Sequence, residues 1–131
     1  MNPSAPRKGS YLVPRHIVDV VGIRPIHLAI IDGIETVSGG EGPWITELKR
    51  QTPHLLLAGR NPVCTDAIAT VCMGYDPMAK SATGPFPGDN HIAMAAALGL
   101  GTNNPKEIET RGLPLSKAIY PYRFEPKERN T

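Results

Sequence analysis

The stretch from residue 26 to residue 44 constrains the fold more than any other part of the chain. It opens with a nearly continuous apolar run, Ile26-His27-Leu28-Ala29-Ile30-Ile31, which is typical of a strand buried on both faces of a parallel sheet. The run ends at Asp32-Gly33, and three glycines then surround Glu41 within residues 39–42. A strand that ends in such a loop places carboxylates and backbone amides where open α/β sheets bind ligands. This stretch therefore predicts a strand followed by a binding loop.

A second apolar run and two capped helices extend this pattern. Residues 55–58 (LLLA) predict a second strand that ends at Gly59. Asn61 and Pro62 favour a helix start there, and an apolar stripe continues the helix to residue 73. A further helix is expected to start near residues 89–90. The order predicts an α/β fold: a small, mainly parallel or mixed sheet covered by helices. Because a sheet of two good strands is thin for such apolar helices, we expect another chain or a missing half to complete part of the core.

The flanking segments predict less regular structure. Residues 1–14 carry three prolines and little to bury, so we expect a flexible lead-in. The α/β domain then covers residues 15–112, with a short amphipathic helix at 15–21, a helical turn or two at 45–50 and a short edge strand at 106–111. Residues 113–131 are rich in proline, tyrosine and charge and are expected to form a surface tail.

Composition excludes several classes of function. Lys and Arg are scattered through a chain of 131 residues with a net charge of +2, so nucleic acid is not an expected partner. No apolar run approaches the ~20 residues of a membrane span, and residues 1–10 lack a hydrophobic signal core. We therefore expect a soluble, cytoplasmic protein. Cys64 and Cys72 would lie ~12 Å apart in one helix, too far for a disulfide, and two thiols are too few for an iron–sulfur cluster.

The strand ends and the helix start predict one site. If the two strands are parallel, their carboxyl ends share one sheet edge, and a crevice there would collect Asp32, the glycine loop and the start of the second helix. Three carboxylates there could bind a divalent metal, and the backbone amides an anionic or polar ligand. The alternative is that the glycines only permit tight turns and the acids cap them. The predicted ligand-binding residues are Asp32, Gly33, Gly39, Gly40, Glu41, Gly42, Asn61 and Asp66, of which Asp32, Glu41 and Asp66 are the predicted metal ligands.

Three other residues have both a chemical and a structural interpretation. Cys64 falls in a first helical turn, where a thiol pKa is lowered, but a core thiol is the favoured interpretation. His91 follows Asp89-Asn90 and could act as a ligand or as an acid–base group; a polar role in the capping turn is favoured. Trp44 is either a lid over the crevice or a core anchor, and the core anchor is favoured.

Several short motifs, in this order, resemble one family. Ile31-Asp32-Gly33, Gly40-Glu41-Gly42-Pro43, the segment 59–67 (GRNPVCTDA) and Asp89-Asn90 with Gly99-Leu100-Gly101 together resemble the C-terminal part of domain-of-unknown-function family 362. The family's helix-start phrase is Asp-Pro-Val-Ala-x-Asp-Ala; this chain has Asn61 and Cys64 where Asp and Ala are usual. The resemblance covers residues 15–112.

The resemblance implies an association with iron–sulfur proteins, because ferredoxin modules often accompany the domain. The ferredoxin cysteines and the export signals of some members do not occur in this sequence. The first functional hypothesis is therefore a redox-associated, enzyme-like domain whose crevice binds a divalent metal or a small polar or anionic ligand. The alternative is a non-catalytic interaction or oligomerisation domain that docks on itself or on a partner supplying the missing half.

Overall fold

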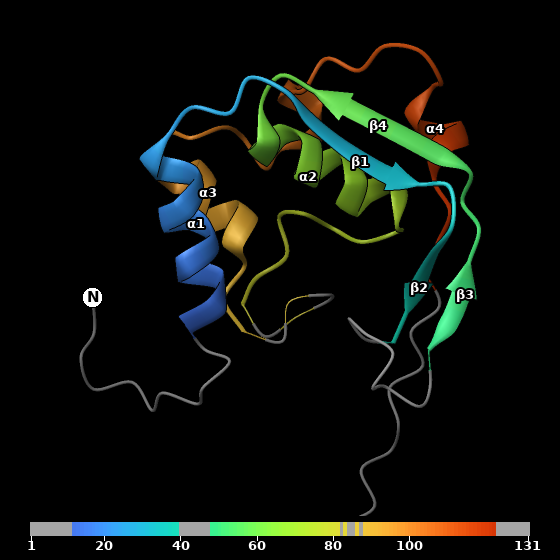
Figure 1. Cartoon of the computed structure of the whole chain (residues 1–131), viewed down its shortest axis with the longest axis horizontal. Helices are drawn as coiled ribbons and strands as arrows, with labels where there is room; N and C mark the ends of the chain where they lie inside the picture. The colour runs from blue at the N-terminus through green and yellow to red at the C-terminus, as the bar shows by residue number, and fades with distance from the viewer. Residues whose placement is uncertain (1–11, 40–47, 82, 84–85, 87, 123–131) are drawn as a thin grey trace, which may run out of the picture.

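A computed structural model of the chain describes residues 12–39, 48–81, 83, 86 and 88–122 (Figure 1). The predictions for Gly40, Glu41, Gly42 and Trp44 lie outside the described residues. The elements in chain order are α1 (Val13–Ile23), β1 (Ala29–Gly33), β2 (Thr36–Ser38), β3 (Lys49–Gln51), β4 (Leu55–Gly59), α2 (Pro62–Cys72), α3 (His91–Ala97), the 3-10 turn η2 (Pro105–Glu107) and α4 (Leu115–Ala118).

The mixed α/β composition is confirmed, but the prediction of a mainly parallel sheet is wrong for the described strands. β1 pairs with β4 in antiparallel register, from Ala29 opposite Gly59 to Gly33 opposite Leu55. β2 and β3 form a second antiparallel pair. A parallel pair needs a crossover of a dozen or more residues, usually a helix. Here the chain between β1 and β4 instead forms β2 and β3, so β4 returns alongside β1 as in a hairpin.

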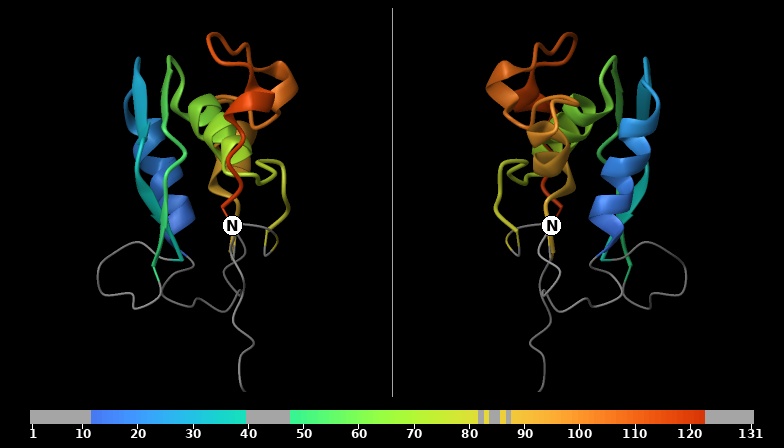
Figure 2. Two further views of the ribbon diagram at one scale, coloured as in Figure 1. Left: turned by 90° about the vertical axis from the view of Figure 1, so that its right-hand side faces the viewer. Right: turned by 90° about the vertical axis from the view of Figure 1, so that its left-hand side faces the viewer.

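The strands are covered on one face only. Along β1 and β4, half-buried and exposed residues alternate, so the prediction that residues 26–31 are buried on both faces is wrong. Ile31, Leu55 and Leu57 point inward, while Ile30 and Leu56 point outward. Figure 2 shows the two layers edge-on, with α1 and the two strands on one side and α2 and α3 on the other. The helices therefore cover the inner face of the sheet and leave its outer face open.

Helix α2 is the centre of the fold, and its predicted start is confirmed. The side chain of Asn61 accepts a hydrogen bond from the Cys64 amide at 3.0 Å, and Pro62 occupies the first turn. The helix contacts β1, β4, α3 and η2, and Ala67 is fully buried. Val63 and Ala67 of α2 form the core with residues of α1 and α3 and with Phe86.

Two further predictions about minor elements need correction. Residues 106–111 do not form an edge strand: Asn104 caps the 3-10 turn η2 through its side chain, and the chain then runs without regular pairing. The segment 45–50 ends in β3 rather than in a helical turn, and residues 45–47 lie outside the described part. The described start of the C-terminal segment is anchored, because the amides of Tyr120 and Tyr122 donate to the carbonyls of Cys72 and Met73. No helix among the described residues is long and apolar enough to cross a membrane.

Candidate functional site: a cavity between the sheet and helix α2

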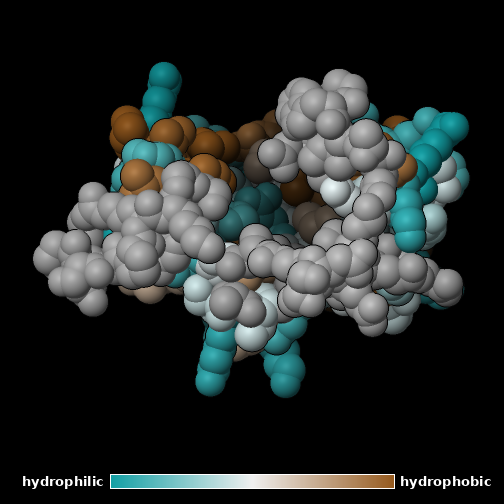
Figure 3. Space-filling view, turned by 90° about the horizontal axis from the view of Figure 1, so that it is seen from below, coloured by the Kyte–Doolittle hydropathy of each residue, from teal (hydrophilic) through white to brown (hydrophobic). Residues whose placement is uncertain are grey.

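A cavity of about 1100 Å³ lies between the inner face of the β1–β4 pair and helix α2. Its walls come from the elements that pack around the core, and most of the side chains are apolar. Figure 3 views the molecule from below and shows a hollow with both brown and teal residues in its depth. The apolar side chains of its walls include Val13, Ile17, Ile31, Leu55, Leu57, Ala69, Met73, Phe86 and Ile92.

Asp66 and His91 line this cavity from two different helices. Asp66 lies in α2 and His91 is the first residue of α3. Burial raises the pKa of the Asp66 carboxyl, and the charge of His91 partly opposes this rise. Burial likewise lowers the pKa of His91, and the carboxylate of Asp66 partly opposes this fall. The two groups therefore interact across the cavity wall, and each is held in an environment that disfavours its charged form.

The position of His91 follows from the residue before it. The side chain of Asn90 accepts a hydrogen bond from the Ala93 amide and so caps α3. Its amide group donates to the carbonyls of Pro77 and Ala79, both at 2.9 Å. These three bonds fix the start of α3 on the 77–79 segment. The ring of His91 then packs edge-on against Phe86, with the centroids 5.8 Å apart. The histidine is held by its backbone and by Phe86, and Asn90 rather than His91 makes the cap.

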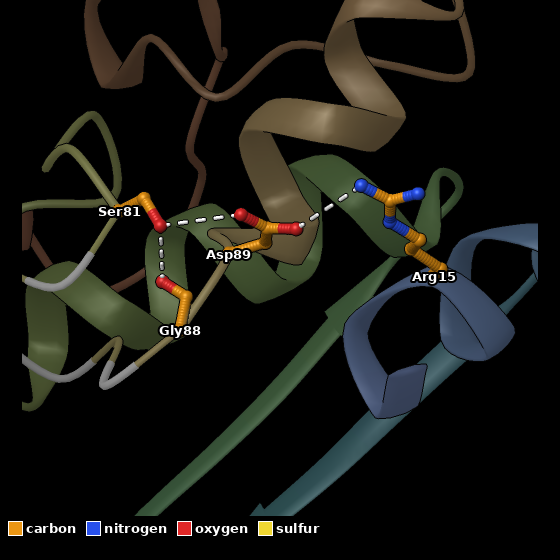
Figure 4. Close-up of polar contacts among 4 residues, drawn as sticks. All are labelled: Arg15, Ser81, Gly88 and Asp89. Atoms are coloured by element: carbon orange, nitrogen blue, oxygen red, sulfur yellow. Dashed lines mark hydrogen bonds and ion pairs between the residues drawn. The ribbon is translucent and has the colours of Figure 1, made fainter. Parts of the chain in front are cut away.

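A second carboxylate, Asp89, lines the cavity where α1 meets α3 (Figure 4). The hydroxyl of Ser81 lies 3.2 Å from the Asp89 Oδ1 atom and 2.8 Å from the carbonyl oxygen of Gly88. The Arg15 Nη2 atom of α1 approaches Asp89 Oδ2 to 3.7 Å, an ion pair longer than a hydrogen bond. The Nε atom of Arg15 is buried and has no hydrogen-bond partner within the described part of the chain. Arg15 therefore offsets the charge of Asp89 and ties α1 to the start of α3.

The charge of the cavity wall has one sign. Its titratable residues include three aspartates, Asp32, Asp66 and Asp89, and one histidine, whereas no Lys or Arg occurs among its described lining residues. Asp89 is partly offset by Arg15, as described above. No hydrogen bond to the carboxylate of Asp66 is found within the described ranges, so this carboxylate is open to a ligand in the cavity. The site thus combines apolar walls with a partly desolvated acid that interacts electrostatically with His91.

The predicted site residues separate into two groups. Asp32, Gly33 and Asp66 line the cavity. Asn61 lies instead at the far end of β4: Asp32 pairs with Leu56, and Asn61 follows five residues later, ~16 Å at ~3.3 Å per residue. This separation follows from the antiparallel pairing, because the end of β1 meets the start of β4 and not its end. The predicted crevice at a shared edge of carboxyl ends therefore does not form.

The two polar side-chain atoms of Asn61 are both used within the protein. Oδ1 accepts from the Cys64 amide, and Nδ2 donates to the Leu100 carbonyl at 2.7 Å. The backbone of Gly101 packs directly against this side chain, so closely that a Cβ there would lie 2.5 Å from Asn61 Oδ1. Asn61 is therefore a structural cap. Gly39, the remaining described glycine of the predicted loop, has a φ of 97° and does not line the cavity.

A metal site receives limited geometric support. Asp32 and Asp66 line the same cavity, but Asp32 is exposed and its Oδ1 accepts a hydrogen bond from the Ile34 amide. Among residues 12–39, 48–81, 83, 86 and 88–122, no group of three or more His, Cys, Asp or Glu side chains is placed to hold a metal ion. The third predicted ligand, Glu41, lies outside these ranges. The metal prediction therefore stays a prediction.

The cysteines border a smaller pocket, of about 520 Å³, between β4, α2 and the 108–118 segment. Both are free thiols, with Cys64 half-buried and Cys72 buried. Burial raises the pKa of the Cys72 thiol, which disfavours the reactive thiolate. Cys72 is therefore a core thiol, whereas Cys64, for which the sequence favours a core role, is only half-buried.

Comparison with protein-family models, with curated proteins and with solved structures found no match to this chain. The resemblance to family 362 consequently stays an expectation from the sequence. Sequence analysis assigned Asp66 to the site and considered His91, but it did not place Asp89 there. The Asn90 cap is the sequence signal that could have placed His91 near Asp66, because it sets His91 at the start of a helix that packs against α2.

Proposed function

We propose that this chain is a small-molecule-binding domain of enzyme type, and that its cavity takes a small amine with an apolar body. The observation that carries the proposal is the open carboxylate of Asp66 beside His91 in an apolar cavity whose described lining contains no Lys or Arg. A cavity of about 1100 Å³ is large enough for a drug-sized molecule, since ligand pockets typically measure ~300–1,000 Å³.

The charge of the cavity favours a cation over an anion. A carboxylate that is partly removed from water is unstable without a partner, and burial raises the pKa of Asp66 for this reason. An ammonium group at hydrogen-bond distance would supply that partner, whereas an anionic group would add repulsion from Asp32, Asp66 and Asp89. The anionic ligand expected from the glycine loop is therefore not the one that these charges favour. The apolar walls would hold the carbon skeleton of the amine.

His91 gives the site a group that can accept a hydrogen bond. Burial lowers the pKa of His91, which favours the neutral imidazole. A neutral imidazole on the cavity wall can accept a hydrogen bond from the ligand ammonium group. In this proposal Asp66 is the binding carboxylate and His91 is a second hydrogen-bond acceptor for the same ammonium group.

The test compares three probes that share a phenyl group but differ in the charge of the head group: 2-phenylethylamine, 2-phenylethanol and 3-phenylpropanoate. Binding is followed by a two-dimensional ¹H–¹⁵N NMR titration of the full chain at pH 7. We expect the amine to bind about tenfold more tightly than the alcohol, because a hydrogen bond to a charged group is worth about 1.5–3 kcal/mol. The carboxylate should bind most weakly, and the shifted amides should include those of α2 near Ala69 and Thr70.

The matched variants are Asp66→Asn and Asp19→Asn. Asp19 is exposed on α1 and does not line the cavity, so its variant should keep the full preference for the amine. Asp66→Asn should bind the alcohol as before and lose the preference. Equal affinities of the wild-type protein for all three probes, or shifts confined to the outer sheet face, would contradict the proposal.

A further inference from the structure

The outer face of the β1–β4 pair is an apolar surface with no cover in the described structure. Leu28 and Ile30 are each 61% exposed, and Leu56 is 66% exposed. In the antiparallel register Ile30 lies opposite Ala58, and Asp32 lies opposite Leu56. Because side chains alternate along a strand, these residues share one face. We call the surface made by Leu28, Ile30, Leu56 and Ala58 the outer sheet face.

The outer sheet face is an unusual surface for a small domain. A two-stranded pair is marginal by itself and is normally stabilised by packing on an apolar face. Here α2 covers the inner face only. The neighbouring helix α1 lies beside the strands in the same layer (Figure 2) and exposes Val20 at 66% and Ile23 at 81%. Exposed apolar side chains that share one face, as Leu28, Ile30 and Leu56 do, mark an interaction surface more often than isolated ones do.

The charges at the two ends of the outer sheet face are complementary to each other. Asp32 lies at one end, opposite Leu56, and Arg60 follows directly after β4 at the other end; both residues are exposed. A two-fold axis that runs across the strands reverses their direction in the second copy. It therefore brings Arg60 of the second copy to the end that carries Asp32, and Asp32 of the second copy to the end that carries Arg60. The same surface thus supplies both halves of an isologous interface.

We propose that the outer sheet face is a dimer interface, and that its occupant is a second copy of this chain related by a two-fold axis. The two outer sheet faces stack with their strands antiparallel, ~10 Å apart as in other face-to-face sheets. Asp32 of each copy pairs with Arg60 of the other at both ends of the stack. This interface is on the opposite side of the sheet from the cavity walls Ile31, Leu55 and Leu57, and the two sites share Asp32, which also lines the cavity.

The size of the surface sets the expected strength of the dimer. The five residues of each strand span ~17 Å, and two strands are ~10 Å wide. An 11-residue helix beside them adds a strip of ~16 by ~10 Å. The contact is then ~330 Å² per copy, about two fifths of the ~800 Å² per partner of a standard stable interface. We therefore expect a weak, reversible dimer with a dissociation constant of about 100 μM or more.

The test is sedimentation velocity of the full chain between about 10 μM and about 1 mM. Leu56→Lys is compared with Leu98→Lys, because Leu98 has the same side chain and the same exposure, 67%, but lies at the end of α3. We expect dimers at the high end of the range for the wild-type protein and Leu98→Lys, and at least tenfold weaker association for Leu56→Lys. A wild-type protein that is monomeric at ~1 mM would overturn the proposal, as would equal weakening by both substitutions.

A charge exchange tests the two-fold arrangement and does not depend on the folding of one variant. Asp32→Arg and Arg60→Asp should each weaken the dimer, since each brings like charges together at both ends. The double variant restores opposite charges and should recover most of the association. A double variant that is weaker than both single variants would overturn the proposed arrangement. Ile30→Lys replaces Leu56→Lys if the latter fails to give a folded spectrum by circular dichroism.

Discussion

Replacing Asn90 by alanine should be one of the most destabilising polar substitutions in the chain. Asn90 is 4% exposed, and its side chain makes three hydrogen bonds: it accepts from the Ala93 amide and donates to the carbonyls of Pro77 and Ala79. Loss of an N-cap costs about 1 kcal/mol. Each carbonyl left without its donor adds about 1 kcal/mol more. We therefore expect Asn90→Ala to lower the free energy of unfolding by about 3 kcal/mol.

The assay is urea denaturation followed by circular dichroism, with the slopes compared so that a midpoint shift reports stability. The control is Asn104→Ala. Asn104 also caps a short helical turn, but its partner Glu107 is exposed, so the expected loss is about 0.5–1 kcal/mol. Asn90→Asp keeps the acceptor that caps α3 but places a buried carboxylate oxygen against the two carbonyl oxygens, so it should cost at least about 2 kcal/mol. Equal losses for the two alanine variants would refute the argument that the buried bonds dominate.

Two further predictions concern packing and pH. Gly59→Ala should lower the free energy of unfolding by about 1–3 kcal/mol through overpacking, because its Cβ would lie 2.0 Å from the Thr65 Oγ1 atom. Gly88→Ala should change the stability little, because no atom of the described residues lies within 4 Å of its Cβ. Equal urea midpoints for the two variants would contradict this. Burial raises the pKa of Asp66 above 3.8, so this carboxyl contributes stability that is present below pH 3.8 and is lost as pH rises through its folded pKa. Asp66→Asn should therefore have a higher urea midpoint than the wild-type protein at pH 7 and a smaller advantage at pH 4; a lower midpoint at pH 7 would show that Asp66 has a stabilising partner.

Locally coded elements were predictable because their signals lie within a few residues. The Asn61-Pro62 start of α2 and the run that forms β4 both appear where the sequence placed them. The helix predicted at 15–21 is present and longer, as Val13–Ile23. Caps, proline at the first helical turn and apolar periodicity act through the backbone of the element itself. They therefore do not depend on where the rest of the chain lies.

Strand direction was not predictable from the apolar runs. Such a run indicates a strand but not its partner, and the assumption of parallel pairing followed from expecting burial on both faces. Pairing of β2 with β3 brings β4 back against β1, and this is a contact between segments more than ten residues apart. Because β4 runs antiparallel to β1, Asn61 lies at the opposite end of the strand pair from Asp32 and outside the predicted site.

The sequence by itself determined the helices, the apolar strands and the carboxylate of Asp66 as a chemically interesting group. The tertiary structure alone decided which groups meet. It brought the start of α3 against α2, so that His91 and Asp66 share a cavity wall, and it left the outer side of β1 and β4 uncovered. The physical reason is that helix and strand preferences depend on interactions between residues close in the sequence. Burial, pKa shifts and open surfaces depend instead on contacts between segments distant in the chain.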